Sequence, residues 1–533
     1  MARPGGAATR DVNAAVARVA RLAFALALLA GVAPLWCARQ LPMVDLPQHL
    51  HLISVLHRLD DPTTLYPQVF AARAELTPYV GYYYPVSLLS WIVPLELANR
   101  LFLSAMVLGL PLATAFLLRS LARPRWPAVL TIPFAYGDSF GWGFVNSSAS
   151  FVLALLSAGL FVRAVTDVPH RRRWALVHAA VLVGVVLMHV QGFLFLALGL
   201  PFLLFTTRTP EDGSRRPLRP RLPATLSTAP AVVLFAIWGA GRLLAPAEVE
   251  AGAPWKAWGP LLSARNVFFK PLRQNLDEFL DLLANLLRDR SDRWGLRAVA
   301  VVAAAALVLW AIGQRGAPRE GPLERWRLPG LAVFAGLLFL FLPFDVRGAV
   351  YYLNTRYAHL VAPLAIASLP VIAARARPAL IAAGAVAALA LAVPLGLGFR
   401  SFDVEAAPLL RFAEESPPAP RIMGLIFNPA SRVATHPVFL HAAAVPARLR
   451  GGITNFSFAQ TPHSPIRYRG RPPPTFPSEW RPDGFRWETM GPAYSNFLVR
   501  GVDPRAVFGA RYGTEVTPVD VAGGMAWLEN HSR

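Results

Sequence analysis

The stretch Met43-Val44-Asp45-Leu46-Pro47-Gln48-His49-Leu50 decides how the rest of this chain is interpreted. It follows the first long apolar run directly, and Pro47 suits the first turn of a new helix, where a backbone N–H is not needed. Residues 46–59 place apolar and polar side chains at helical spacing, which predicts a helix lying along a membrane surface. One face of this helix carries the apolar residues Leu52, Ile53, Leu56 and Leu59. The other face carries the polar residues His51, Ser54 and Arg58.

Asp45 is the acidic residue of this stretch. Asp45 and His49 are four residues apart, so both project on the apolar side of the helix, toward protein or lipid rather than water. Two interpretations of Asp45 stay open. Its carboxylate either caps the helix by accepting a backbone N–H, or lies at the lipid boundary as a reactive group.

The composition is that of a protein that crosses a membrane many times. The chain has 533 residues, 55% hydrophobic and 16% charged, and its mean hydropathy is +0.42. The net charge of +21 comes almost entirely from arginine, because Lys256 and Lys270 are the only lysines. This bias indicates a GC-rich bacterial genome and not nucleic-acid binding. The single cysteine, Cys37, excludes an internal disulfide and a cysteine-based metal cluster.

The apolar runs predict a mainly α, polytopic bundle of about eleven spans. They lie near 19–38, 99–118, 127–144, 148–165, 174–190, 192–207, 225–244, 296–314, 329–344, 356–374 and 378–398. Arginines cluster in every second short connection, and arginine-rich connections lie in the cytoplasm. We therefore expect a cytoplasmic tail at 1–18, a transmembrane domain at 19–399 and an extracytoplasmic domain at 400–533, in a bacterial inner membrane. Segments 39–98, 245–295 and 345–355 then also lie outside.

Segment 82–94 is apolar, but it is short and contains prolines near both ends. Counting it as a span would break the arginine alternation, so we expect a second interfacial helix there. Residues 275–290 predict another interfacial helix, because leucines recur at helical spacing, and this helix either only seals the bundle or serves as a lid over the substrate. After 399, strands are expected at 421–427, 455–459, 497–500 and 526–529, and a helix at 436–450, with 461–492 irregular. Together these predict a small α/β domain.

The order of a first span, Asp45, two interfacial helices and a second span resembles the membrane-embedded GT-C glycosyltransferases. Three further stretches resemble their protein O-mannosyltransferase and aminoarabinose-transferase branches: Tyr84-Pro85-Val86-Ser87-Leu88-Leu89-Ser90-Trp91, Glu96-Leu97-Ala98-Asn99-Arg100-Leu101 and Thr355-Arg356-Tyr357. The resemblance covers the first 120 residues well and the remainder by topology. It implies a GT-C-like bundle that takes sugars from polyprenyl-phosphate donors, with Asp45 in the place of the essential acid and Arg356 at the lipid phosphate.

The predicted topology brings further candidates to the outer face. His189 ends the fifth span, and Arg347 and Arg356 flank the start of the tenth. Arginine offers bidentate hydrogen bonds to phosphate, and a carboxylate can take the proton of an attacking hydroxyl. Plainer alternatives stay open, with His189 as a satisfied helix end and Arg347 as a solvated loop charge. We expect catalysis by Asp45, donor-phosphate binding by Arg356, Arg347 and His189, and support from His49, Tyr84 and Tyr357.

The sequence thus predicts transfer of a sugar from a polyprenyl-phosphate lipid to a cell-envelope acceptor, which could be a glycan, a lipid or a protein. Membrane lipids would surround the enzyme, and no cofactor is assigned, although a divalent metal stays open. The sequence lacks the signatures of P-loop ATPases, His-Glu-x-x-His metalloproteases and Gly-x-Ser-x-Gly hydrolases. Two alternatives remain: a non-catalytic scaffold that recruits an envelope partner, and a flippase for lipid-linked glycans.

Overall fold

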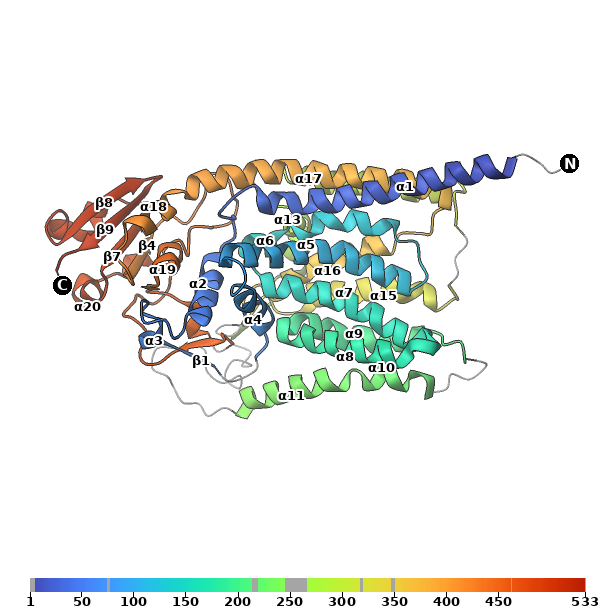
Figure 1. Ribbon diagram of the computed structural model, residues 1–533, viewed down its shortest axis with the longest axis horizontal. Coiled ribbons are helices and arrows are strands. Elements are labelled where there is room, and N and C mark those ends of the chain that lie inside the picture. Colours follow the sequence, from blue (N-terminus) through green and yellow to red (C-terminus); the bar gives the residue numbers. More distant parts are fainter. Residues whose placement is uncertain are drawn as a thin grey trace.

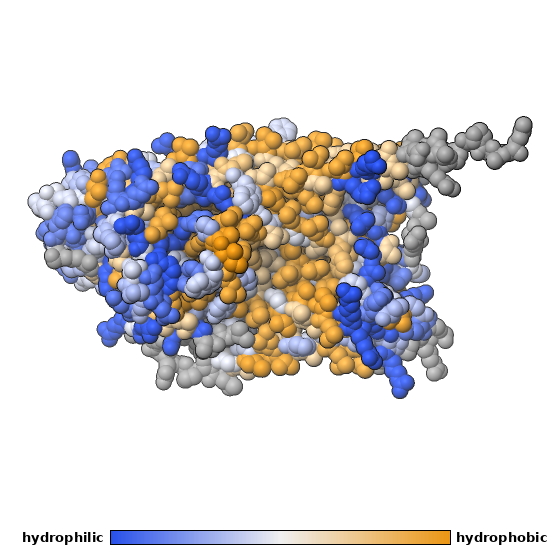
Figure 2. All heavy atoms as spheres, in the orientation of Figure 1, coloured by the Kyte–Doolittle hydropathy of each residue, from blue (hydrophilic) through white to orange (hydrophobic). Residues whose placement is uncertain are grey.

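A computed structural model of the chain describes residues 5–73, 77–212, 219–244, 266–316, 320–346, 350–461 and 463–532. The structure is 63% helical. Figure 1 shows a bundle of roughly parallel and antiparallel helices, with a smaller mixed domain of C-terminal residues at one end. Figure 2 shows a band of hydrophobic side chains across the visible face of the bundle, between two more hydrophilic ends. Such a band is the surface expected where lipid surrounds a protein.

Several helices match the predicted spans. Within the described residues, five helical stretches are long and apolar enough to cross a membrane, and a bent pair makes a sixth if it forms one span. These stretches contain α1 (Gly5–Val32), α5 (Leu95–Ser120), α7 (Val145–Thr166), α14 (Arg293–Ala311) and α17 (Arg377–Ala406), and the bent pair contains α10 (Leu222–Leu226) and α11 (Ala229–Leu244). Shorter apolar helices complete the bundle: α8 (Arg171–Met188), α9 (Val190–Thr206), α15 (Arg327–Phe341) and α16 (Ala358–Ala367). Helix α1 begins inside the predicted tail, and α17 continues beyond Phe399.

Two predicted spans are not continuous α-helices. The segment expected to span at 127–144 is a 3-10 helix, η2 (Trp126–Ala135), followed by the short helix α6 (Asp138–Trp142). Pro133 and the glycines at 137, 141 and 143 disfavour a longer α-helix there. The segment expected at 356–374 is a 3-10 turn, η7 (Thr355–Tyr357), followed by α16, which ends before Pro370. Apolarity therefore did not predict the backbone form of these segments, and their depth in the membrane stays a prediction.

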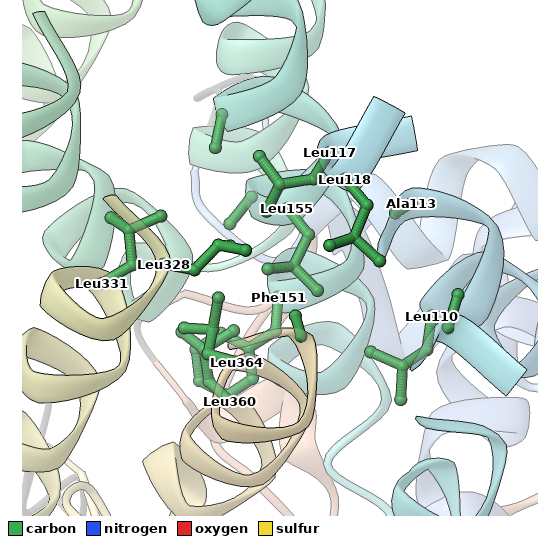
Figure 3. Packing of buried hydrophobic residues seen from close by; sticks show 14 of the residues in the cluster. Leu110, Ala113, Leu117, Leu118, Phe151, Leu155, Leu328, Leu331, Leu360 and Leu364 are labelled. Carbon is green, nitrogen blue, oxygen red and sulfur yellow. The ribbon is translucent and has the colours of Figure 1, made fainter. Parts of the chain in front are cut away.

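Close packing of small and apolar side chains holds the bundle together. Figure 3 shows Leu117, Phe151 and Leu155 packed between α5 and α7, beside leucines of α15 and α16. A Cβ atom on Gly159 would lie 2.7 Å from the Phe116 ring, so only glycine allows α7 to approach α5 this closely. In lipid, helices gain stability from such close contact rather than from excluding water.

The arginine-rich connections meet at one end of the bundle, the end where α1 begins (Figure 1). We call it the arginine end. Contacts between different connections link them: Arg123 with Glu320 at 3.8 Å, Arg171 with Glu211 at 2.8 Å, Arg208 with Glu324 at 3.4 Å, and Arg375 with Gln314 at 2.8 Å. These five connections therefore lie at the same end of the bundle, as the alternation of arginine-rich connections predicted. Their location in the cytoplasm stays a prediction.

The segments predicted to lie outside meet at the opposite end, which we call the domain end. The first of them forms α2 (Leu46–His57), α3 (Tyr66–Val69), β1 (Phe70–Ala72) and α4 (Val80–Leu89). Helix α2 agrees with the predicted interfacial helix, and α4 overlaps the second. At 1.5 Å per residue, the ten residues of α4 reach about 15 Å, half of the hydrocarbon core. Helix α13 (Leu272–Leu283) overlaps the predicted 275–290 helix.

The polar face expected on α2 is wrong for two residues. His51 and Ser54 are buried, at 0% and 5% exposure. The C-terminal domain contacts His51, whose Nε2 lies 3.0 Å from the carbonyl oxygen of Gly452, and the Ser54 hydroxyl lies 3.4 Å from that of Tyr66 in the first outer segment. A contact between residues as distant in sequence as His51 and Gly452 leaves no local sequence signal. Helical periodicity alone therefore predicted that the polar face of α2 would be exposed to water.

The C-terminal domain contains a five-stranded sheet in the order β5-β4-β7-β9-β8. The strands are β4 (Arg421–Ile426), β5 (Ile453–Thr454), β7 (Asn496–Arg500), β8 (Val516–Ala522) and β9 (Met525–Asn530), with α18 (Pro408–Glu415) and α19 (Ala444–Arg450) beside them. β4 pairs in parallel with β5 and β7, whereas β9 is antiparallel to β7 and β8. Strands predicted at 421–427, 497–500 and 526–529 are β4, β7 and β9.

Three local expectations in this domain are wrong. The predicted helix at 436–450 begins only at Ala444, the predicted strand at 455–459 is a 3-10 turn, η9 (Phe458–Gln460), and β8 was not expected. β8 contains Pro518 and exposes Val519 and Val521, so it lacks the apolar run of a central strand. The 461–492 segment contributes β6 (Ile466–Tyr468), which pairs with β1 and ties the domain to the first outer segment.

Candidate active site

Asp45 occupies the N-cap position of α2, but its side chain makes no capping hydrogen bond. The backbone places it instead, because the Asp45 N–H donates to the carbonyl of Trp142 at 3.0 Å. Gly143 has a φ of 85°, and a Cβ there would lie 3.0 Å from the Asp45 nitrogen. Only glycine permits this approach. The Asp45 carboxylate lies 3.4 Å from Nε2 of His441, a residue of the C-terminal domain.

His441 bridges two carboxylates. Its Nε2 faces Asp45 and its Nδ1 lies 3.5 Å from the carboxylate of Glu479. Burial alone would lower the pKa of His441, but the charges of Glu479 and Asp45 outweigh burial and raise that pKa above its ordinary value. The pKa of Glu479 is also raised, first by burial and then by the negative charge of Asp45. The arrangement is a carboxylate–imidazole–carboxylate chain that favours a cationic ring in the middle.

A second acid–histidine pair lies at the same end of the bundle. Asp138, in α6, lies 2.9 Å from Nε2 of His436. Nδ1 of His436 is buried and has no hydrogen-bond partner. In both pairs the acid lies in the chain that precedes the C-terminal domain, and the imidazole lies in the segment between β4 and α19 of that domain. The docked domain therefore completes both pairs.

Arg356 and His189 form a cationic site nearby. Arg356 Nη1 lies 3.4 Å from His189 Nε2, and its guanidinium lies 3.7 Å from the centre of the Phe144 ring. His189 Nδ1 accepts the backbone N–H of Gln191 at 3.1 Å, so a neutral ring carries its proton on Nε2. Both facing nitrogens are then donors and cannot satisfy each other. Nε of Arg356 is also buried without a partner.

An anionic oxygen between these donors would satisfy them. The Arg356 side chain is fixed on its other side, where Nη2 donates to the carbonyl of Tyr351 at 2.8 Å. Asp45 and Asp138 are both close enough for their charges to act on Arg356. The acid–histidine pairs and the cationic site therefore belong to one electrostatic neighbourhood at the domain end.

The other predicted site residues have different surroundings. His49 is buried, its Nδ1 lies 2.6 Å from the Tyr83 hydroxyl, and burial lowers its pKa to about 4. Tyr84 is partly exposed on α4. Tyr357 is buried and donates its hydroxyl to the carbonyl of Gln191 at 3.0 Å, which holds the start of α9 beside His189. Arg347 lies outside the described residues.

Among the described residues, no group of three or more His, Cys, Asp or Glu side chains is arranged to hold a metal ion. The described residues therefore offer no such cluster of ligands for the divalent metal that the sequence left open. The acids near the site face imidazoles or a guanidinium instead.

Sequence reasoning missed four residues of this neighbourhood: Asp138, His436, His441 and Glu479. One signal was available for Asp138, because an acid inside an apparently apolar span is by default a functional candidate. His441 and Glu479 carry no such signal. They lie near Asp45 only because the C-terminal domain docks on α2.

Comparisons with known proteins give similarities to solved structures. No protein-family model matches the chain, and no curated protein matches it. Crystal structures of ArnT from Cupriavidus metallidurans, in the apo state and bound to undecaprenyl phosphate, share 13% and 14% identity with TM-scores of 0.47 and 0.48. They cover 95% and 96% of this chain and 97% and 98% of their own. The arabinofuranosyltransferase AftD from Mycobacteria shares 15% identity with a TM-score of 0.45, over 97% of this chain and 40% of its own.

An oligosaccharyltransferase from Archaeoglobus fulgidus shares 12% identity with a TM-score of 0.42, over 83% of this chain and 64% of its own. All of these proteins are GT-C glycosyltransferases, the class that the motifs around Asp45 and Arg356 resemble. Because the identities are low and the TM-scores lie below 0.5, these similarities do not assign a function to this chain.

Proposed function

We propose that this protein is a membrane glycosyltransferase that moves a sugar from a polyprenyl-phosphate donor to a cell-envelope acceptor at the outer side of a bacterial inner membrane. The observation that carries the proposal is the pair of facing donors on Arg356 and His189, in the electrostatic neighbourhood of the Asp45 carboxylate. The motif resemblance supports the same reaction class.

The donor phosphate would bind between Arg356 and His189. Two N–H groups 3.4 Å apart, with a further unpartnered N–H on Arg356, match the oxygens of a phosphate. The Phe144 ring under the guanidinium holds its plane in place. The site lies where the bundle meets the outer segments, a level that the predicted topology assigns to the lipid headgroups, so the polyprenyl chain could remain in the membrane.

Asp45 would act as the general base. An acceptor hydroxyl attacks the anomeric carbon of the donor sugar, and its proton passes to the Asp45 carboxylate. The bond between that carbon and the phosphate oxygen breaks, and the phosphate keeps the electron pair. The phosphate needs no strong acid, because its charge is met by Arg356 and His189. His441, between Asp45 and Glu479, would hold the base in position.

The two alternatives fit the described residues less well. A flippase needs a continuous polar path across the membrane, whereas the core between the two ends is packed with hydrocarbon side chains in the part shown in Figure 3. A scaffold needs no unpartnered donors on a buried arginine. Such groups cost free energy in a protein without a ligand for them.

The test is incubation of the purified protein, in lipid nanodiscs, with a panel of polyprenyl-phosphate sugars and extracts of envelope glycans, lipids and proteins. Release of polyprenyl phosphate that depends on both donor and acceptor is the expected result. Protein that binds donor lipids but never releases polyprenyl phosphate with any acceptor would favour the scaffold. Donor transport across sealed vesicles without release would favour the flippase.

A further inference from the structure

Glu479 pairs with the imidazole that faces the proposed base. The three side chains come from separate parts of the chain: Asp45 precedes α2, His441 lies between β4 and α19, and Glu479 lies between β6 and α20 (Trp487–Met490). Asp45 and Glu479 contact opposite nitrogens of one ring, at 3.4 Å and 3.5 Å. In the part of the chain that the structure describes, Glu479 has no other ion pair. The two carboxylates are therefore linked through the imidazole.

The imidazole is much more buried than either carboxylate. The side chain of His441 is 3% exposed, against 19% for Asp45 and 29% for Glu479. A buried cation needs a negative charge close by, because removal from water penalises the charged form. The two carboxylates supply this charge and raise the pKa of His441 above its ordinary value in spite of burial. Each of them therefore shares in holding the cation.

The shared pairing resolves a conflict in the proposed role of Asp45. A general base loses its negative charge when it takes the proton of an attacking hydroxyl. If Asp45 were the only negative partner of His441, this step would leave a buried cation without a counter-charge, which opposes the proton transfer and makes Asp45 a weaker base. With Glu479 on the other nitrogen, the cation keeps a counter-charge while Asp45 carries the proton.

The other groups that face Asp45 do not supply a second negative charge to the imidazole. They are His49 of α2, Tyr83 of α4, Tyr352 and Arg356. His49 also faces His441, but burial lowers the pKa of His49 to about 4, so its ring is neutral at pH 7. Burial raises the pKa of both tyrosines, so these are neutral too, and the arginine is a cation. Asp45 and Glu479 are the groups whose negative charges act on His441.

We infer that Glu479 is a positioning residue of the proposed reaction: it holds His441 as a cation and so leaves Asp45 free to take the proton. The inference rests on the proposed function for the role of Asp45, but not for the coupling of Glu479 to His441. It gives the C-terminal domain a direct influence on the strength of the base.

The experiment compares the wild type with Glu479→Gln in nanodiscs, by the pH dependence of transfer and by NMR of ¹⁵N-labelled histidines. The His441 signal is identified by its loss in His441→Gln. The pKa of His441 should be lower in Glu479→Gln than in the wild type. When the pH is lowered from about 8.5 to about 6.5, transfer by Glu479→Gln should fall about five- to tenfold more than that of the wild type, because the imidazole then becomes protonated with Asp45 as its only partner.

The matched control is Glu488→Gln, at an exposed glutamate of the same domain that pairs with Arg511 at 3.4 Å. It should behave as the wild type does in both measurements. A loss of structure in Glu479→Gln would lower transfer by one factor at every pH, whereas the inferred role changes the shape of the profile. In a His441→Gln background, Glu479→Gln should have little further effect on that shape, because no cation remains to be held.

The two measurements separate this inference from the proposed function. An unchanged titration of His441 in Glu479→Gln would overturn the inference, and so would pH profiles of transfer that have the same shape in the wild type and the variant. A lowered pKa of His441 in a protein that transfers no sugar from any donor would support the coupling of Glu479 to His441 and count against the proposed function.

Discussion

Replacing Asp45 with asparagine separates a catalytic carboxylate from a structural one. Asparagine keeps the shape of the side chain and its capacity to accept a hydrogen bond, but it cannot take the proton of an attacking hydroxyl. If Asp45 is the general base, transfer should fall by about 10²–10⁴-fold, which corresponds to roughly 3–5 kcal/mol of activation free energy.

The same substitution should lower the free energy of unfolding only slightly. The Asp45 side chain makes no capping hydrogen bond, and it lies 3.4 Å from His441. With asparagine at position 45, His441 remains paired with Glu479, so no buried cation is left alone. Because the Asp45 side chain is 19% exposed, solvent screens the pair and its loss should cost about 1 kcal/mol of unfolding free energy. The loss in rate should therefore exceed the loss in stability several times over.

The assay compares initial transfer rates, donor-lipid binding and thermal unfolding of the wild type and Asp45→Asn in the same nanodiscs. Donor binding should be retained and the unfolding temperature should change little, while transfer nearly disappears. Asp61→Asn is the control, because Asp61 follows the same helix but pairs with Arg58 and Thr63. Near-normal turnover of Asp45→Asn would refute the reasoning, since the carboxylate would then be structural and the scaffold would be the better interpretation.

Donor binding, acid stability and topology can each be tested separately. Arg356→Lys should weaken binding of polyprenyl phosphate roughly 10–100-fold, because an ammonium cannot reproduce the guanidinium fork; unchanged affinity in a calorimetric titration would exclude the phosphate role. Acidification should destabilise the protein through His49, whose pKa burial lowers to about 4. The neutral His49 ring contributes to the free energy of unfolding above its unfolded pKa of about 6.5, and this contribution is smaller by about 2 kcal/mol at pH 5. The unfolding temperature of His49→Gln should therefore fall less between pH 7 and pH 5 than that of the wild type. In a cysteine-free background, Thr63→Cys and Pro94→Cys should both react with an impermeant maleimide added outside. Arg172→Cys should react only after the membrane is permeabilised. Reaction of Thr63→Cys without reaction of Pro94→Cys would mean that α4 crosses the membrane.

Features that depend on local sequence could be predicted. The arginine-rich connections meet at one end because charge near a span end decides orientation segment by segment. Helix α2 follows from its own periodicity and from Pro47. Asp45 and Arg356 could be selected as candidates because depth in a membrane is a one-dimensional property, readable from the distance to the nearest span end. Their shared neighbourhood follows from that depth.

Features that depend on docking could not be predicted. The 3-10 helix η2 has the apolarity of a span, and hydropathy carries no information on backbone form. His441 and Glu479 lie about 400 residues beyond Asp45 in the sequence, in a domain whose contact with α2 has no periodic signature. The same docking covers His51, so one unpredicted interface explains the missed His441 and Glu479 and the wrong expectation for His51.

The docking of the C-terminal domain also bears on how the proposed base could be controlled. Strands β1 and β6 pair across the interface, and Arg448 pairs with Glu96 at the start of α5. These contacts lie around α2 and fix the segment that carries His436 and His441. Effective catalysis requires reacting groups to be held within a fraction of an ångström, and small displacements lower rates strongly. A shift of this domain would therefore move both imidazoles away from Asp138 and Asp45 together. The interface between the helix bundle and the C-terminal domain is therefore where an acceptor could couple its own binding to the assembly of the two acid–histidine pairs.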